Sequence, residues 1–153
     1  QTSYAAVDEG CRSAGGVPMG PFELMDLIGL DTNFAITGAI YGALGRPERF
    51  KPPEIQKQLV LKGMTGRKVG KGFYIYQDGK KTTENPEAIK LLGTGTLFNG
   101  NELWTRIRTA IIEEAELVVS EGTAGQSDVD TAIKLAMNFP KGPFEWRKEN
   151  TVA

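Results

Sequence analysis

Apolar residues recur every three or four positions along most of the chain, which is the spacing of helices that bury one face. Glycine or proline interrupts this rhythm at intervals, as expected where helices end and begin. The pattern therefore predicts helices over residues 4–14, 22–28, 31–44, 54–62, 86–92, 102–121 and 128–137.

The best-marked helix runs from about residue 102 to 121 and stops at Gly122. Its apolar stripe consists of Leu103, Ile107, Ile111, Ala115 and Val118. A stripe of this kind needs a partner surface to cover it. Two N-terminal caps are also predicted: Asp31 for the third helix, and Ser127 with Asp130 as a capping box for the last.

The character of the chain changes between residues 66 and 81, where the sequence reads "GRKVGKGFYIYQDGKK". Four glycines and a run of aromatic and β-branched residues, followed by Asp78-Gly79, are typical of a turn that leads into a hairpin. We therefore expect an all-α fold, mainly helical, with one short β-hairpin near residues 73–82.

One short pattern occurs twice, as "PMGPFE" and "PKGPFE". A single offset of 122 residues relates seven identical pairs: Val7/Val129, Asp8/Asp130, Pro18/Pro140, Gly20/Gly142, Pro21/Pro143, Phe22/Phe144 and Glu23/Glu145. Ungapped agreement of this kind indicates an internal repeat. We divide the chain into a first copy at 1–80, a short helix and linker at 81–101, and the N-terminal part of a second copy at 102–153.

The two copies differ in what they contain. The second copy has the long helix 102–121 before its Val-Asp pair, whereas the first copy has no counterpart for that leading helix. We expect the helix to dock across the first copy, within one chain or by exchange between chains, and we expect a homodimer.

The amino-acid composition limits which partners and cellular locations are expected for this chain. Eighteen basic and nineteen acidic residues give a net charge of −1, which favours neither nucleic acid nor an anionic membrane as a partner. No apolar run is long enough to span a bilayer, so we expect a cytoplasmic protein. The single cysteine, Cys11, is best interpreted as a small buried apolar residue.

Histidine is absent, which removes the usual general base and most zinc sites. Gly93-x-Gly95 lacks the third glycine of a dinucleotide fingerprint and has no strand before it. The segment from Gly66 to Lys71 has one residue too few between its glycines for a phosphate loop. No catalytic, metal or cofactor site is therefore assigned to this chain.

Three stretches carry a family resemblance: "GGVPMGPFELMDLIGLD", "FKPP" and "GRKVGKGFYIY". In order and spacing they resemble the C-terminal domain of 3-hydroxyacyl-CoA dehydrogenases across about residues 6–76. The stretch "IIEEAELVVSEGTAGQSDVDTAIKLAMNFPKGPFEW" resembles the second copy of that domain in tandem members of the family. Glu113 stands where the family usually has asparagine.

The resemblance implies an oxidoreductase of fatty-acid metabolism, including β-oxidation, in which an N-terminal Rossmann domain binds NAD and carries a catalytic His-Glu pair. The helical C-terminal domains line the acyl-CoA pocket and form much of the dimer contact. This chain then corresponds to a fragment without the NAD-binding domain, which binds no cofactor and is inactive alone. The alternative is a non-catalytic assembly or dimerisation module that retains this fold.

Two groups of residues are candidates for substrate contact under this resemblance. The loop Pro18, Met19, Gly20, Pro21 and Phe22 offers a stiff backbone and an adaptable apolar side chain to an acyl group. Arg67, Lys68 and Lys71 are candidates for the phosphates of coenzyme A. The alternatives are a helix-linking turn for the loop and a solvated turn for the basic residues. The second copy carries Lys141 in place of Met19.

Overall fold

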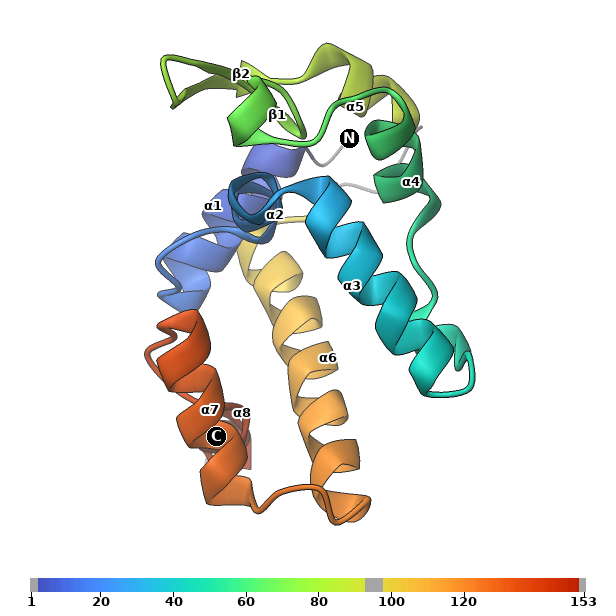
Figure 1. The fold of residues 1–153 in the computed structure, drawn as a ribbon. Helices are drawn as coiled ribbons and strands as arrows, with labels where there is room; N and C mark the ends of the chain where they lie inside the picture. The colour runs from blue at the N-terminus through green and yellow to red at the C-terminus, as the bar shows by residue number, and fades with distance from the viewer. Residues whose placement is uncertain (1–2, 93–97, 152–153) are drawn as a thin grey trace. The chain divides into compact units, whose positions relative to one another are not determined.

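The computed structural model describes residues 3–92 and 98–151 and is mainly helical, with one two-stranded antiparallel sheet (Figure 1). Its elements are α1 (Tyr4–Gly15), α2 (Pro21–Ile28), α3 (Leu30–Ala43), the 3₁₀ turn η1 (Glu48–Phe50), α4 (Glu54–Leu61), η2 (Arg67–Val69), β1 (Tyr74–Gln77), β2 (Lys80–Glu84), α5 (Pro86–Leu92), α6 (Gly100–Ser120), α7 (Gln126–Met137) and α8 (Pro143–Thr151). The expected fold class is confirmed, and the hairpin lies where the aromatic run and Asp78-Gly79 placed it.

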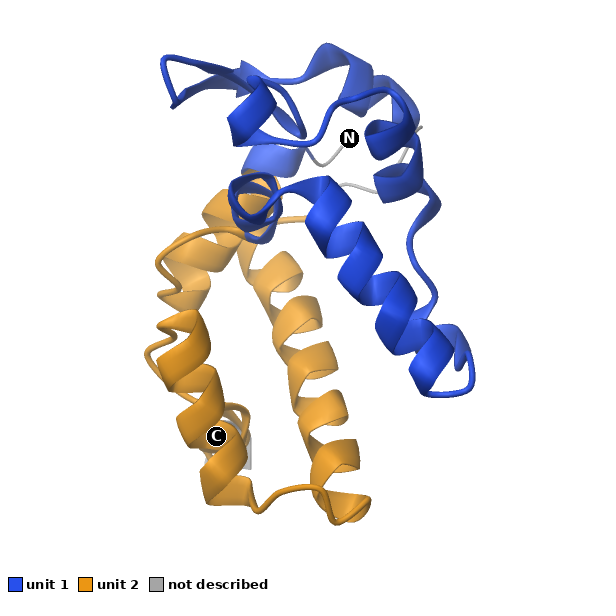
Figure 2. Ribbon diagram, in the orientation of Figure 1, with its two compact units in different colours: residues 1–5, 21–97 blue, residues 6–20, 98–153 orange. Residues whose placement is uncertain are grey.

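The described chain forms two compact units (Figure 2). Unit 1 comprises residues 3–5 and 21–92, and unit 2 comprises residues 6–20 and 98–151. The two units are defined by packing, whereas the two copies are defined by the sequence repeat. Residues 6–20 belong to the first copy by sequence and to unit 2 by packing.

The core of unit 1 is aromatic and lies between α2, the hairpin and the first turn of α1. Tyr4, Phe22 and Phe73 meet edge to face, with ring centroids 4.7 to 4.9 Å apart. The hydroxyl of Tyr4 donates a 2.8 Å hydrogen bond to the carbonyl of Ala88, which satisfies its polar end inside the core. The fully buried side chains around them include Leu30, Leu59, Met64 and Tyr74.

Asp26 on α2 ties the hairpin to the helices of unit 1. Its buried carboxylate accepts hydrogen bonds from the backbone N–H groups of Phe73 and Tyr74, both at 2.9 Å, and from the Tyr76 hydroxyl at 3.1 Å. Burial, and then the charge of Asp26, raises the pKa of Tyr76 above its ordinary value. Gly72 is required beside this carboxylate, because a Cβ there would overlap Asp26.

The core of unit 2 forms where α6 packs against residues of the first copy. Trp104 of α6 and Trp146 of α8 meet nearly perpendicular, with centroids 5.3 Å apart, around the buried Cys11 and Val17. Gly15 lets Trp104 approach closely, since a Cβ would lie 2.7 Å from the indole. The expectation that helix 102–121 docks on the first copy is therefore confirmed for residues 6–20.

Both predicted caps are wrong. Helix α3 begins one residue before Asp31, with Gly29 at its N-cap and no side-chain hydrogen bond there. Helix α7 begins after Gly125, which leaves Ser127 inside the helix. Asp130 is buried instead and accepts the backbone N–H of Phe144 at 2.8 Å, so a tertiary contact replaces the local capping bond.

Candidate functional site

The structure explains why the repeat contains both an aspartate and a loop glycine. Asp8 and Asp130 are buried, and a Cβ at Gly20 or Gly142 respectively would overlap them. Each glycine thus lets the loop backbone close over a carboxylate from the preceding helix. The offset of 122 residues also relates both ends of α1 to those of α7, and the first residue of α2 to that of α8. The repeat is therefore structural as well as sequential.

The candidate acyl-contact loop connects α1 to α2, and its five residues differ in accessibility. Pro18 is exposed, Met19 is half-exposed and Gly20 is buried against Asp8. Pro21 is the first residue of α2, where proline suits a helix start, and the ring of Phe22 packs in the aromatic core of unit 1. Pro18 and Met19 are thus the members of the loop whose side chains are most accessible to a ligand.

The candidate phosphate-binding residues lie in unit 1, on and directly after η2. Arg67 and Lys68 are exposed and Lys71 is half-buried. Among the described residues, no carboxylate lies within ion-pair distance of these three cations. The chain is shaped by Gly66 and Gly70, whose φ angles of 119° and 82° suit glycine. This turn presents uncompensated positive charge to solvent.

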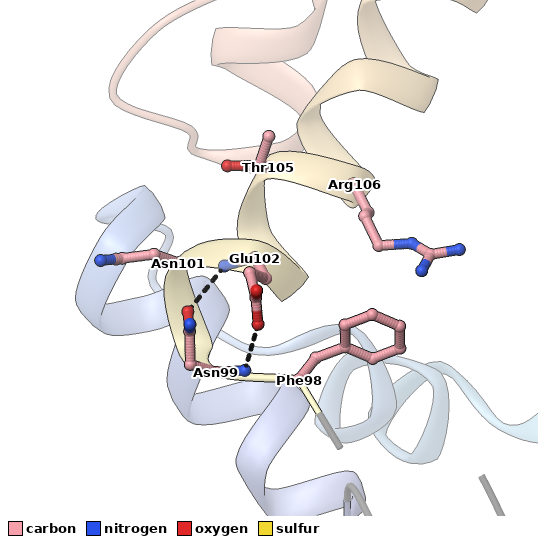
Figure 3. Close-up of a pocket in the computed structure, with 6 residues that line it drawn as sticks. All are labelled: Phe98, Asn99, Asn101, Glu102, Thr105 and Arg106. Atoms are coloured by element: carbon pink, nitrogen blue, oxygen red, sulfur yellow. Dashed lines mark hydrogen bonds between the residues drawn. The ribbon is translucent and has the colours of Figure 1, made fainter. Parts of the chain in front are cut away.

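The first turn of α6 borders a pocket of about 410 Å³, which the sequence did not reveal (Figure 3). It is lined by Phe98, Asn99, Asn101, Glu102, Thr105 and Arg106. Asn99 and Glu102 form a capping box, with reciprocal bonds of 3.0 and 2.8 Å. The guanidinium of Arg106 lies over the ring of Phe98, 4.7 Å from its centroid. The pocket is therefore lined by one acidic and one basic side chain, Glu102 and Arg106.

A second pocket, of about 350 Å³, lies between α7 and α8. It is lined by Gln126, Ser127, Asp130, Thr131, Lys134, Phe144, Glu145 and Lys148. Four of these residues are related by the same offset to positions that contact the hairpin segment in unit 1: Gln126 to Tyr4, Phe144 to Phe22, Glu145 to Glu23 and Lys148 to Asp26. Lys148 stands where Asp26 accepts the hairpin's N–H groups, so this surface cannot hold a hairpin by the same bonds. The repeat, taken together with the hairpin contacts of the first copy, is the feature that could have predicted this pocket.

Cys11 and Glu145 are titratable groups whose pKa values are shifted by their structural surroundings. Burial raises the pKa of the Cys11 thiol to about 11, so it is protonated and unreactive near neutral pH, as the sequence predicts. The pKa of Glu145 is lowered by its hydrogen bonds to Lys134 and to the backbone N–H of Gly142. Within residues 3–92 and 98–151, no three His, Cys, Asp or Glu side chains gather as a metal site would require. Gly93 and Gly95 lie outside the described residues.

The fold and the repeated loop define a class of protein: a helical domain that carries no dinucleotide fold in its described residues and recurs within one chain. The chain belongs to the family of 3-hydroxyacyl-CoA dehydrogenase C-terminal domains, whose model matches residues 1–76 and 103–152. The resemblance seen in the sequence is confirmed, and each matched segment contains one copy of the loop.

Relatives and solved structures agree with this family. A 3-hydroxyadipyl-CoA dehydrogenase of Escherichia coli (strain K12) is 24% identical over 218 residues, which cover 92% of this chain and 46% of that protein. A fatty acid oxidation complex subunit alpha of Shewanella amazonensis is 33% identical over 139 residues, covering 86% of this chain and 19% of that protein. The crystal structure of 3-hydroxybutyryl-CoA dehydrogenase from Escherichia coli K12 matches with a TM-score of 0.77 at 25% identity, over 96% of this chain and 48% of that one. The chain thus spans about half the length, or less, of these proteins.

Among the described residues, no helix is both long enough and apolar enough to cross a membrane.

Proposed function

We propose that the chain is the helical C-terminal region of an NAD-dependent 3-hydroxyacyl-CoA dehydrogenase, such as a 3-hydroxybutyryl-CoA dehydrogenase. Its pathway is fatty-acid β-oxidation or related acyl-CoA metabolism. The observation that carries the proposal is the family match over two segments, each built around one Pro-x-Gly-Pro loop. The relatives are named 3-hydroxyadipyl-CoA dehydrogenase, 3-hydroxybutyryl-CoA dehydrogenase and fatty acid oxidation complex subunit alpha, and these names support the same reaction class.

In the proposed enzyme, the redox reaction takes place in another domain and not in this chain. Hydride transfer needs a bound nicotinamide and a general base for the 3-hydroxyl proton. The sequence contains no histidine and no complete dinucleotide fingerprint. NAD is therefore assigned to another domain of the parent enzyme, and this chain contributes part of the acyl-CoA pocket and of the dimer contact.

Met19 is the residue proposed to line the acyl pocket. Pro18 and the closure of Gly20 over Asp8 restrict the backbone on both sides of it, while its own side chain stays half-exposed. A flexible thioether fits acyl chains of different lengths. The equivalent Lys141 forms an ion pair with Glu149, so the second loop has a different role. Arg67, Lys68 and Lys71 are proposed to contact the phosphates of coenzyme A.

The test is Met19→Lys in the full-length enzyme that contains this chain. A charge beside the acyl tail should raise KM for long substrates far more than for short ones. Loss of contact with about four methylenes, at roughly 0.8 kcal/mol each, corresponds to a fall of up to about a hundredfold in kcat/KM. Steady-state kinetics on a short and a long 3-hydroxyacyl-CoA measure this difference.

Met137→Lys is the matched control, because Met137 is an exposed methionine at the end of α7, outside the loop. It should leave the chain-length dependence unchanged. An equal loss for all substrates, together with a lower Tm for Met19→Lys, would instead identify the loop as a helix-linking turn. Unchanged kinetics would favour the non-catalytic assembly module.

A further inference from the structure

The chain contains four methionines, and their sulfur atoms have different surroundings. Met64 is fully buried in the core of unit 1, and its sulfur accepts a 3.1 Å hydrogen bond from the side-chain amide of Asn85. The sulfur of Met25 accepts a bond of the same length from the amide of Gln56, a residue that is only 7% exposed. Both sulfur atoms thus lie against the core of unit 1 and share a lone pair with a buried amide.

Met19 and Met137 are the other two methionines. Met19 lies half-exposed in the loop between α1 and α2 and is not part of either core of the described residues. Met137 is the last residue of α7 and is 37% exposed. Within residues 3–92 and 98–151, no donor forms a hydrogen bond with either sulfur. The thioethers of Met19 and Met137 are therefore the ones open to a reagent dissolved in water.

Hydrogen peroxide reacts with an accessible thioether. The sulfur lone pair attacks one oxygen of the peroxide, an S–O bond forms as the O–O bond breaks, and the proton on the transferred oxygen moves to the other oxygen, which leaves as water. The sulfur loses two electrons and the peroxide gains them. The product is methionine sulfoxide, which is polar and which methionine sulfoxide reductases return to methionine.

The loop around Met19 offers few hydrogen-bond donors to a sulfoxide oxygen. Pro18 and Pro21 have no N–H group, and Gly20 is closed over Asp8. A sulfoxide oxygen at this position is therefore hydrated, and its hydration opposes contact with an apolar acyl chain. The equivalent loop of the second copy carries Lys141 and has no thioether to oxidise.

We propose that Met19 is a reversible oxidation site, at which a peroxide converts the thioether to the sulfoxide and thereby weakens the binding of long acyl chains. The effect on substrates rests on the acyl pocket of the proposed function, whereas the selectivity among the four methionines rests on burial and hydrogen bonding. Met137 is oxidised as well, without consequence for the substrate, because it lies outside the loop. Cys11 does not compete, because its buried thiol, with a pKa raised to about 11, stays protonated near neutral pH.

The first experiment maps oxidation in this chain. The protein is treated with dilute hydrogen peroxide for increasing times, and tandem mass spectrometry of its peptides locates each added oxygen. Met19 and Met137 should be oxidised at least about tenfold faster than Met25 and Met64, whose sulfur atoms are hydrogen-bonded against the core. The chain unfolded in urea is the control, and there all four should react at similar rates. Equal rates in the folded chain would overturn the site.

The second experiment measures the effect in the full-length enzyme that contains this chain. Peroxide should lower kcat/KM for a long 3-hydroxyacyl-CoA about tenfold and for a short one less than about twofold, because the sulfoxide is polar but uncharged. A methionine sulfoxide reductase with dithiothreitol should restore the activity. A long 3-hydroxyacyl-CoA, added without NAD, should slow the oxidation of Met19 and not that of Met137.

Met19→Leu and Met137→Leu are the matched pair, and the kinetics of each variant are compared before and after peroxide. Met19→Leu should lose the peroxide sensitivity with long substrates, and Met137→Leu should keep it. Sulfoxide at Met19 with unchanged kinetics, or sensitivity that survives in Met19→Leu, would overturn the inference. A chain-length effect of Met19→Lys without any oxidation of Met19 would support the proposed pocket and overturn the oxidation site alone.

Discussion

Asp26 shows how one buried residue organises a whole segment. Its carboxylate accepts two successive backbone N–H groups at the start of β1 and one tyrosine hydroxyl, so the hairpin is fixed to α2 by charge-assisted hydrogen bonds. The equivalent position of the second copy is Lys148, which cannot accept any of them. A single substitution therefore separates two otherwise similar helices that follow the repeated loop.

We expect Asp26→Asn to lower the free energy of unfolding by about 3 kcal/mol, because an amide carries no charge and turns a donor toward a backbone N–H. Urea unfolding measures the change in midpoint. Asp128→Asn is the control, since Asp128 is exposed in the first turn of α7, and its effect should be within about 0.5 kcal/mol. Equal midpoints for Asp26→Asn and the unsubstituted chain would show that the carboxylate does not hold the hairpin.

At the scale of elements, helix starts depend on which residue satisfies the first backbone N–H groups. The stripe on α6 placed that helix to within two residues of its observed start, and Asn99 with Glu102 supplies a complete capping box. Helix α7 has Gly125 at its N-cap and no side-chain hydrogen bond to cap it. Asp130 instead accepts a tertiary hydrogen bond from the backbone N–H of Phe144. Capping residues in a sequence thus identify candidates, and packing selects among them.

Asn99→Ala should destabilise the protein by about 1 kcal/mol through loss of the side-chain bond to the Glu102 N–H. Asn101→Ala is the matched control, because Asn101 is exposed in the same helical turn and forms no capping bond. Thermal unfolding of both variants compares them directly. A loss of the same size in Asn101→Ala would mean that helix propensity, and not the cap, accounts for the change.

At the scale of the whole molecule, the repeat and the packing divide the chain differently. The first helix, α1, contributes Tyr4 to the aromatic core of unit 1 and Cys11 to the core of unit 2. Each unit has its own core and its own buried carboxylates. In both units a buried carboxylate accepts a backbone N–H group, as Asp26 and Asp130 do.

The isolated chain should show no measurable affinity for NAD(H) and no oxidation of 3-hydroxyacyl-CoA. The physical reason is the lack of a histidine and of a complete dinucleotide fingerprint in the sequence. Calorimetric titration with NADH and an absorbance assay for NADH production check both parts, with a complete 3-hydroxyacyl-CoA dehydrogenase as the positive control. Turnover above the enzyme-free rate, in material free of contaminating dehydrogenase, would contradict this expectation.

The sequence by itself determined the helical fold, the position of the hairpin, the repeat and the family, because periodicity, turn residues and motif spacing are local properties. It also placed Cys11 inside, since small apolar residues are usually buried. Only the tertiary structure decided that Gly20 closes over Asp8, that Phe22 packs in the aromatic core of unit 1, and that Asp130 accepts the backbone N–H of Phe144. Each of these contacts brings together residues that are separated in the sequence. The hydrophobic pattern shows which side chains are buried, but it does not show which distant residue each side chain will contact.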